Sequence, residues 1–223
     1  MDKRLLINAL TKFLSGLLAV GLLLFLPAGT IHYWNAWLFI VVMFVPMLIA
    51  GLYFLISSPD LMAKRLRTDE REAPQKQVIL LSCFLFVGGF LLCALDYRFG
   101  WSHLPRGVSL GASAVLLIGY GLYAEVMREN AFLSRTVELQ EDQKVVDTGL
   151  YGIVRHPMYA ATVLLFISIP LVLGSVYGFL LFLLYPLLLV KRIKNEEELL
   201  TQGLPGYAEY KRKVRYRLLP YIW

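Results

Sequence analysis

Residues 158–190, MYAATVLLFISIPLVLGSVYGFLLFLLYPLLLV, decide the fold class, because these 33 residues carry no charge. As one helix they would be about 50 Å long, whereas the hydrocarbon core of a bilayer is about 30 Å thick. Gly174-Ser175 lies at the midpoint and is typical of a turn, and each half carries a proline, Pro170 and Pro186. We therefore predict a tight helical hairpin in the membrane.

Four further apolar segments precede this hairpin, and each is long enough to span a bilayer as a helix. They cover residues 5–26, 34–56, 78–95 and 108–127. The composition agrees, because 58% of the residues are hydrophobic and the mean hydropathy is +0.62, against roughly 45–50% apolar residues in soluble proteins. The sequence therefore predicts an all-α integral-membrane protein with about six transmembrane helices, four of them in a region 1–127.

Basic residues indicate which ends of these helices face the cytoplasm. They gather in the loop 57–77, between 128 and 155, and after residue 190, whereas residues 27–33 hold none. By the positive-inside rule, both termini and both flanks of the hairpin are predicted to be cytoplasmic. A basic face beside anionic lipid also accounts for the net charge of +6, so we predict contact with membrane lipids and no nucleic-acid partner.

Titratable and aromatic side chains cluster where the hairpin begins and ends. Pro157 suits the first turn of a helix, which places His156 at the entry of the hairpin and Tyr159 one turn further on the same face. Arg192 and Glu196 follow the hairpin at i, i+4 spacing. On spacing alone, the rings fit an interfacial anchor and the charges a surface ion pair. If the hairpin folds back, however, all four side chains face one pocket.

The C-terminal tail, and the histidines and cysteines that could bind a metal, give less specific signals. Residues 206–217 interleave aromatic and basic side chains, which is typical of a helix on the membrane surface; covering a pocket is the alternative. With only three histidines, and two cysteines ten residues apart, no metal site is predicted.

One series of motifs resembles a known family. The series is Gly149-x-Tyr151-x-x-x-Arg155-His156-Pro157-x-Tyr159, then Arg192-x-x-x-Glu196-Glu197, then Tyr207-x-x-Tyr210. It is similar, in order and spacing, to the isoprenylcysteine carboxyl methyltransferase family and its prokaryotic relatives. The resemblance covers residues 128–223, and the N-terminal half shows no matching motif.

The resemblance implies an integral-membrane methyltransferase that uses S-adenosylmethionine, bound in a cytosolic pocket covered by the C-terminal segment. Residues 128–223 would then be the catalytic region, in the inner membrane of a prokaryote or in the endoplasmic reticulum. Arg192 would hold the substrate carboxylate, and Glu196 would lie near the amino end of the cofactor. The implied cofactor contacts are Gln143, Lys144, Val145, Val146, Tyr151, His156, Pro157, Met158, Tyr159 and Glu196.

The acceptor implied by the resemblance is lipidic or prenylated, with the carboxylate of an isoprenylcysteine-like substrate preferred. Such a carboxylate is already ionised at neutral pH and needs no general base. A phospholipid amine or a small thiol would need one, for which Glu196, Glu197 and His156 are candidates. A sterol-type reductase using NADPH and a non-enzymatic membrane protein remain the alternatives from other classes.

Overall fold

The computed structural model describes residues 3–67 and 73–223, and every regular element in these ranges is helical. The elements are α1 (Lys3–Ala28), α2 (Trp34–Ser57), α3 (Pro59–Leu66), α4 (Ala73–Phe99), α5 (Arg106–Glu129), the 3-10 turn η1 (Gly149–Gly152), α6 (Pro157–Val172), α7 (Val176–Phe182), α8 (Tyr185–Gly203) and α9 (Tyr207–Lys213). Five helical stretches are long and apolar enough to cross a membrane, and α6 is a shorter apolar helix of 16 residues. The predicted all-α membrane architecture is confirmed.

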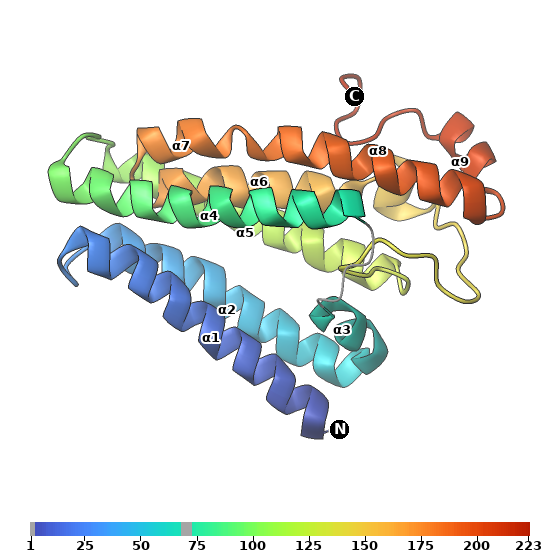
Figure 1. Cartoon of the computed structure of the whole chain (residues 1–223), viewed down its shortest axis with the longest axis horizontal. Coiled ribbons are helices and arrows are strands. Elements are labelled where there is room, and N and C mark those ends of the chain that lie inside the picture. Colours follow the sequence, from blue (N-terminus) through green and yellow to red (C-terminus); the bar gives the residue numbers. More distant parts are fainter. Residues whose placement is uncertain (1–2, 68–72) are drawn as a thin grey trace.

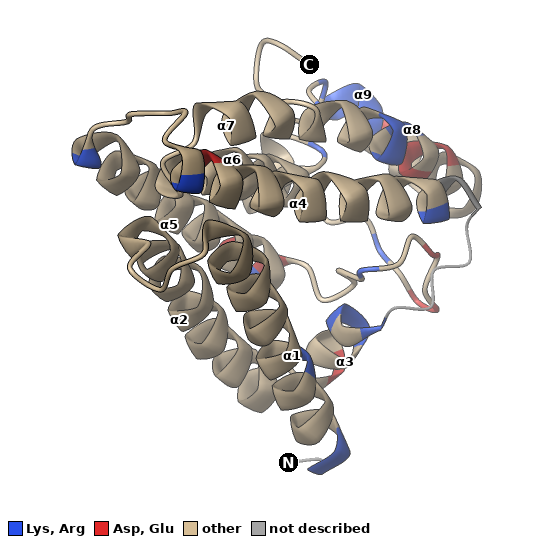
Figure 2. Ribbon diagram, turned by 60° about the vertical axis from the view of Figure 1, so that its left-hand side comes forward, with Lys and Arg blue, Asp and Glu red and all other residues tan. Residues whose placement is uncertain are grey.

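The long helices run side by side and their connections gather at two ends (Figure 1). One end, here called the far end, holds the turns between α1 and α2, α4 and α5, and α6 and α7. The other, here called the pocket end, holds the N-terminus, α3, α9 and the segment between α5 and η1. Charged residues concentrate at the helix ends, and the stretches between them are largely without charge (Figure 2). This distribution suits helices that cross hydrocarbon.

The predicted turn of the hairpin lies between α6 and α7. Gly174 adopts a φ of +79°, which a residue with a Cβ rarely takes, and it lies against Asn35. Ser175 then caps α7, because its Oγ accepts a hydrogen bond from the Gly178 N–H at 2.9 Å. The second half of the hairpin is longer than predicted. It is interrupted after Phe182, and α8 carries it on to Gly203, well past Val190, the last residue of the uncharged run.

A buried carboxylate joins two of the far-end turns. Asp96, at the end of α4, is 1% exposed and accepts hydrogen bonds from the Ser102 N–H at 2.6 Å and the Ser102 hydroxyl at 2.7 Å. The Ser175 hydroxyl also donates to Asp96, at 2.5 Å. Nearby, the Tyr33 hydroxyl donates to the Leu173 carbonyl at 2.6 Å. Polar groups within this apolar end are thus satisfied by one another.

The apolar core lies between the far end and the pocket end. Leu116 of α5, Leu165 and Ile169 of α6, and Phe182 of α7 are almost fully buried in it. Gly119 of α5 lets α6 approach closely, because a Cβ at that position would lie 3.0 Å from Leu165 Cγ. This packing fixes where α6 starts, and therefore where the first residues of the predicted site lie.

Candidate functional site

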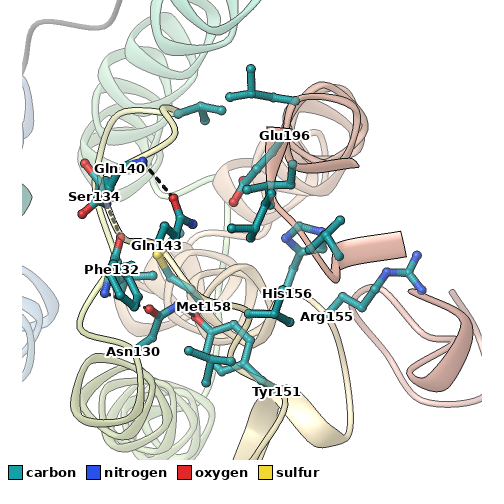
Figure 3. A pocket seen from close by; sticks show the side chains of 18 of the residues that line it. Asn130, Phe132, Ser134, Gln140, Gln143, Tyr151, Arg155, His156, Met158 and Glu196 are labelled. Atoms are coloured by element: carbon teal, nitrogen blue, oxygen red, sulfur yellow. Dashed lines mark hydrogen bonds between the residues drawn. The ribbon is translucent and has the colours of Figure 1, made fainter. Parts of the chain in front are cut away.

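A concave pocket opens at the pocket end, and charged, polar and apolar side chains all contribute to its lining. Four parts of the chain form its walls: residues 130–146, the segment from η1 into the first turn of α6, the second half of α8, and α9 with the turn before it. Figure 3 shows the side chains arranged around a central space, with Glu196 and Gln143 pointing into it and Arg155 pointing away.

Three of the predicted residues form one hydrogen-bonded group on the pocket wall. The Tyr159 hydroxyl donates to Glu196 Oε2 at 2.5 Å, and Arg192 Nε donates to the Tyr159 hydroxyl at 2.8 Å. Tyr159 is 4% exposed, in the first turn of α6, and the other two stand one turn apart on α8. The prediction that the folded-back hairpin brings these side chains together is confirmed. The Tyr159 hydroxyl thus holds the Glu196 carboxylate and the Arg192 guanidinium next to each other.

His156 is the residue before the first turn of α6, and its ring stacks on Tyr159 with centroids 5.6 Å apart. Only 5% of its surface is exposed. The interpretation of these two rings as interfacial anchors is therefore wrong, since anchors keep a polar edge in water. Both rings instead belong to the pocket wall.

Tyr151, in η1, ties two walls of the pocket together. Asn130, just after α5, donates from Nδ2 to the Tyr151 hydroxyl at 2.9 Å, and the Tyr210 hydroxyl donates to the Tyr151 carbonyl at 2.8 Å. Burial raises the pKa of the Tyr151 hydroxyl, so it stays protonated at any physiological pH. It therefore serves as a neutral hydrogen-bonding group rather than as a base.

Behind the wall, Glu197 forms a buried ion-pair cluster. It is 3% exposed and accepts from Arg155 Nε at 2.6 Å, from Arg217 Nε at 2.9 Å and, more weakly, from His156 Nε2 at 3.4 Å. Arg155 also donates to the carbonyls of Val214 and Arg215. Glu197 does not line the pocket. Its treatment as a candidate base is therefore wrong, because two guanidinium groups already engage the carboxylate.

The C-terminal segment covers the pocket. The backbone N–H groups of Arg155 and His156 donate to the carbonyls of Tyr216 and Arg217, each at 2.9 Å, so the tail runs along the start of α6. Tyr207 and Tyr210 of α9 are buried and line the pocket. Of the two interpretations of this tail, the one in which it covers a pocket is confirmed.

Two polar atoms on the pocket wall have no partner among the described residues. They are Gln140 Oε1, an acceptor, and the Tyr207 hydroxyl, which can donate or accept; both are fully buried. A buried polar group without a partner costs about 1–3 kcal/mol. Together with the Glu196 carboxylate, these atoms present hydrogen-bonding sites of the kind needed by a ligand with amine and hydroxyl groups.

The predicted site residues line this pocket with one exception. Arg192 lines it, and so do Gln143, Lys144, Val145, Val146, Tyr151, His156, Met158, Tyr159 and Glu196. Pro157 does not: it is buried at the first position of α6, where its fixed φ starts the helix. Their roles toward a ligand stay predictions, as does the division of the chain at residue 128.

Sequence reasoning missed the wall formed by residues 130–140. Gln140 N donates to Gln143 Oε1 at 3.0 Å, and Gln140 Nε2 donates to the Phe132 carbonyl at 2.5 Å, which folds the segment back on itself. The segment has no helical or strand periodicity. Asn130, directly after the last turn of α5, was the one local signal, because Asn favours helix ends and turns.

The fold and this pocket define a class, an all-helical membrane protein with a covered polar pocket at one end of its helices. Residues 108–205 match the family described as PEMT: Phospholipid methyltransferase. A curated relative, Delta(14)-sterol reductase TM7SF2 of Mus musculus, is 28% identical over 91 residues, which cover 40% of this chain and 22% of that protein. The chain thus matches about a fifth of the length of that relative.

A solved structure extends the likeness to most of the chain. The structure of the eukaryotic intramembrane Ras methyltransferase ICMT (isoprenylcysteine carboxyl methyltransferase), without a monobody, has a TM-score of 0.56 and 22% sequence identity. The match covers 91% of this chain and 74% of that one. The predicted resemblance to the isoprenylcysteine carboxyl methyltransferase family is thereby confirmed at the level of the fold.

Proposed function

We propose that this protein is a membrane methyltransferase that transfers a methyl group from S-adenosylmethionine to an apolar acceptor. The observation that carries the proposal is the hydrogen-bonded group of Glu196, Tyr159 and Arg192 on the wall of a pocket that nearly all of the predicted cofactor residues line. The phospholipid methyltransferase match covers most of the same residues, and the likeness to the intramembrane methyltransferase supports the fold.

The donor set suits S-adenosylmethionine. Glu196 would accept from the ammonium group of its amino-acid end, while Gln140 Oε1 and the Tyr207 hydroxyl would engage the polar groups that remain. Leu200, Leu204 and α9 close the pocket against water. When bound, the cofactor supplies an electrophilic methyl group on a cationic sulfur, so a carboxylate acceptor becomes a methyl ester and S-adenosylhomocysteine is left.

For such an acceptor the residues of the chain would mainly position the reactants. A carboxylate is ionised at neutral pH, so no side chain has to remove a proton. Arg192 would orient it, and Tyr159 would keep Arg192 and Glu196 in fixed relation. We propose an isoprenylcysteine-like carboxylate as the acceptor. The phospholipid methyltransferase match makes a phospholipid amine the second candidate.

Calorimetric titration of the purified protein with S-adenosylmethionine, S-adenosylhomocysteine and NADPH tests the proposal. The wild type should bind the first two and not the third. Glu196→Gln should weaken the binding of S-adenosylmethionine by about tenfold or more, since a charge-assisted hydrogen bond contributes about 1.5–3 kcal/mol. The matched control is Glu198→Gln, two positions along α8 and exposed, which should leave the affinity within about twofold.

The outcomes separate the candidate functions. A folded wild type that binds neither S-adenosylmethionine nor S-adenosylhomocysteine would refute the methyltransferase proposal. Binding of NADPH instead would favour a reductase, the activity named for the mouse relative. If the wild type binds S-adenosylmethionine and S-adenosylhomocysteine, and the Glu196→Gln and Glu198→Gln variants bind them with equal affinities, the methyltransferase proposal stands but Glu196 is not part of the site.

A further inference from the structure

After the tail has crossed the start of α6, residues 217–223 fold into a closed turn. The N–H groups of Arg217 and Leu218 both donate to the Trp223 carbonyl, at 3.0 and 2.9 Å. Inside the turn, Tyr221 adopts a φ of +67°, which a residue other than glycine takes only where the surrounding structure requires it. The turn therefore has a defined shape, and this shape fixes which of its side chains are exposed.

Three apolar side chains of the turn are exposed, and they are here called the tip. Leu219 is 48% exposed, Tyr221 88% and Ile222 78%. In Figures 1 and 2 the end of the tail stands clear of the helices on the side of α7 and α8. Exposed apolar side chains gathered in one place mark a surface that meets another apolar phase.

The other face of the turn packs on membrane-spanning helices. Leu218 is buried in a cluster that includes Leu189 of α8, and Trp223 packs against the same cluster. Leu189 belongs to the uncharged run 158–190, so the turn lies beside a part of α8 that is suited to hydrocarbon. On the outer surface of this part, Leu187 is 65% exposed. The tip is thus continuous with a surface of the helices that faces lipid.

The tail that leads to the tip is basic. Residues 206–223 hold five basic residues and one acidic residue, Glu209, and Figure 2 shows the positive charge gathered on α9. Arg212 and Lys213 have acidic partners, but both ion pairs are exposed and therefore weak. An apolar tip that follows exposed basic residues suits the boundary of a bilayer, where the bases meet anionic headgroups and the tip reaches the acyl chains.

The turn is joined directly to the part of the tail that closes the pocket. The carbonyls of Tyr216 and Arg217 accept hydrogen bonds from the N–H groups of Arg155 and His156, each at 2.9 Å. Arg217 is also the first residue of the turn, and its guanidinium carbon lies 5.2 Å from the centre of the Trp223 ring. Because Arg217 belongs to both, the tail cannot leave the start of α6 without moving the turn. Whatever binds the turn only in this position stabilises the closed tail.

We propose that the tip inserts into the leaflet on the pocket side of the membrane, and that this insertion holds the C-terminal cover of the pocket closed. The partner is the bilayer itself, through its acyl chains and anionic headgroups. A ligand of the pocket then exchanges only when the tip leaves the lipid. The inference goes beyond the proposed function and does not depend on it, because the same coupling acts on any ligand that the pocket holds.

Fluorescence quenching in nanodiscs tests the insertion. A bimane label is placed at Tyr221→Cys and, as the matched control, at Glu209→Cys on the exposed side of α9. Cys83→Ser removes the exposed native cysteine from both proteins, whereas Cys93 is buried. Lipids with a nitroxide high on the acyl chain should quench the label at 221 at least about twofold more strongly, since an inserted tip lies roughly 5–10 Å inside the headgroup boundary.

Hydrogen exchange in the same nanodiscs tests the coupling to the cover. Ile222→Asp should speed the exchange of the peptide that contains Arg155 and His156 by about tenfold or more, which is roughly the factor for returning one large aliphatic side chain to water. Ile222→Leu stays apolar and should exchange as the wild type does. Ile222→Lys should have a smaller effect than Ile222→Asp, because a lysine can extend its ammonium group to the headgroups.

The outcomes separate the parts of the inference. Equal quenching of the two labels would overturn the insertion, and unchanged exchange in Ile222→Asp would overturn the coupling. Equal acceleration by Ile222→Asp and Ile222→Lys would also overturn it, because contact within the protein, rather than with lipid, would then hold the tail. A wild type without affinity for S-adenosylmethionine would refute the proposed function and leave these measurements unaffected.

Discussion

Removing the carboxylate of Glu197 should detach the C-terminal segment from the pocket. Glu197→Ala leaves the guanidinium groups of Arg155 and Arg217 without their carboxylate, and Arg155 is only 7% exposed. Deleting one partner of a buried ion pair costs about 3–5 kcal/mol, because the other charge remains desolvated. The equilibrium constant for opening of the tail should therefore rise by about two to four orders of magnitude.

Hydrogen exchange followed by mass spectrometry measures this opening directly. The N–H groups of Arg155 and His156 lose their acceptors when the tail leaves, so the peptide that contains them should exchange faster in Glu197→Ala. Glu197→Gln keeps an acceptor oxygen and should fall between the variant and the wild type. Glu209→Gln, whose ion pair with Arg212 is exposed, should exchange as the wild type does. Equal exchange in Glu197→Ala and Glu209→Gln would refute the reasoning.

Three further predictions concern packing, pH and topology. Gly89→Ala should lower the melting temperature and reduce the free energy of unfolding by about 1–3 kcal/mol, because its Cβ would meet the buried ring of Phe182. The control is Gly88→Ala, whose Cβ would have nothing within 4 Å; equal melting temperatures of the two variants would contradict this prediction. The hydrogen bond from Lys213 lowers the pKa of Asp147, so this contact stabilises α9 above about pH 4 and is lost as the pH falls below it. Hydrogen exchange of α9, corrected for intrinsic rates, should therefore become faster below about pH 4 in the wild type but not in Asp147→Asn. A reporter fused after Trp223 should read cytoplasmic, and a signal from the opposite side would contradict the predicted orientation.

The membrane helices were predictable because their signal is local. An uncharged run of sufficient length must be a helix in hydrocarbon, and its backbone bonds are all internal. The turn at Gly174 was predictable for the same reason, since a 33-residue run is too long for one crossing. Because the hairpin returns to the end where it starts, Tyr159 and Glu196 must lie near each other, and this could be predicted without knowing any side-chain contact.

The rest of the site depends on contacts between distant residues. Residues 130–140 have no periodicity, and their course is set by bonds such as those from Arg65 and Arg192 to two of their carbonyls. The different surroundings of the Glu196 and Glu197 carboxylates could not be predicted from the sequence either. Neighbours on a helix point about 100° apart, so one carboxylate faces the pocket and the next faces Arg155 and Arg217.

The buried carboxylate of Asp96 makes two connections of the far end share one acceptor. It accepts two hydrogen bonds from Ser102, in the turn after α4, and one from Ser175, in the turn after α6, 79 residues along the chain from Asp96. Losing this carboxylate would leave all three donors without their acceptor at once. The two turns should therefore open together, as one cooperative unit, rather than one after the other.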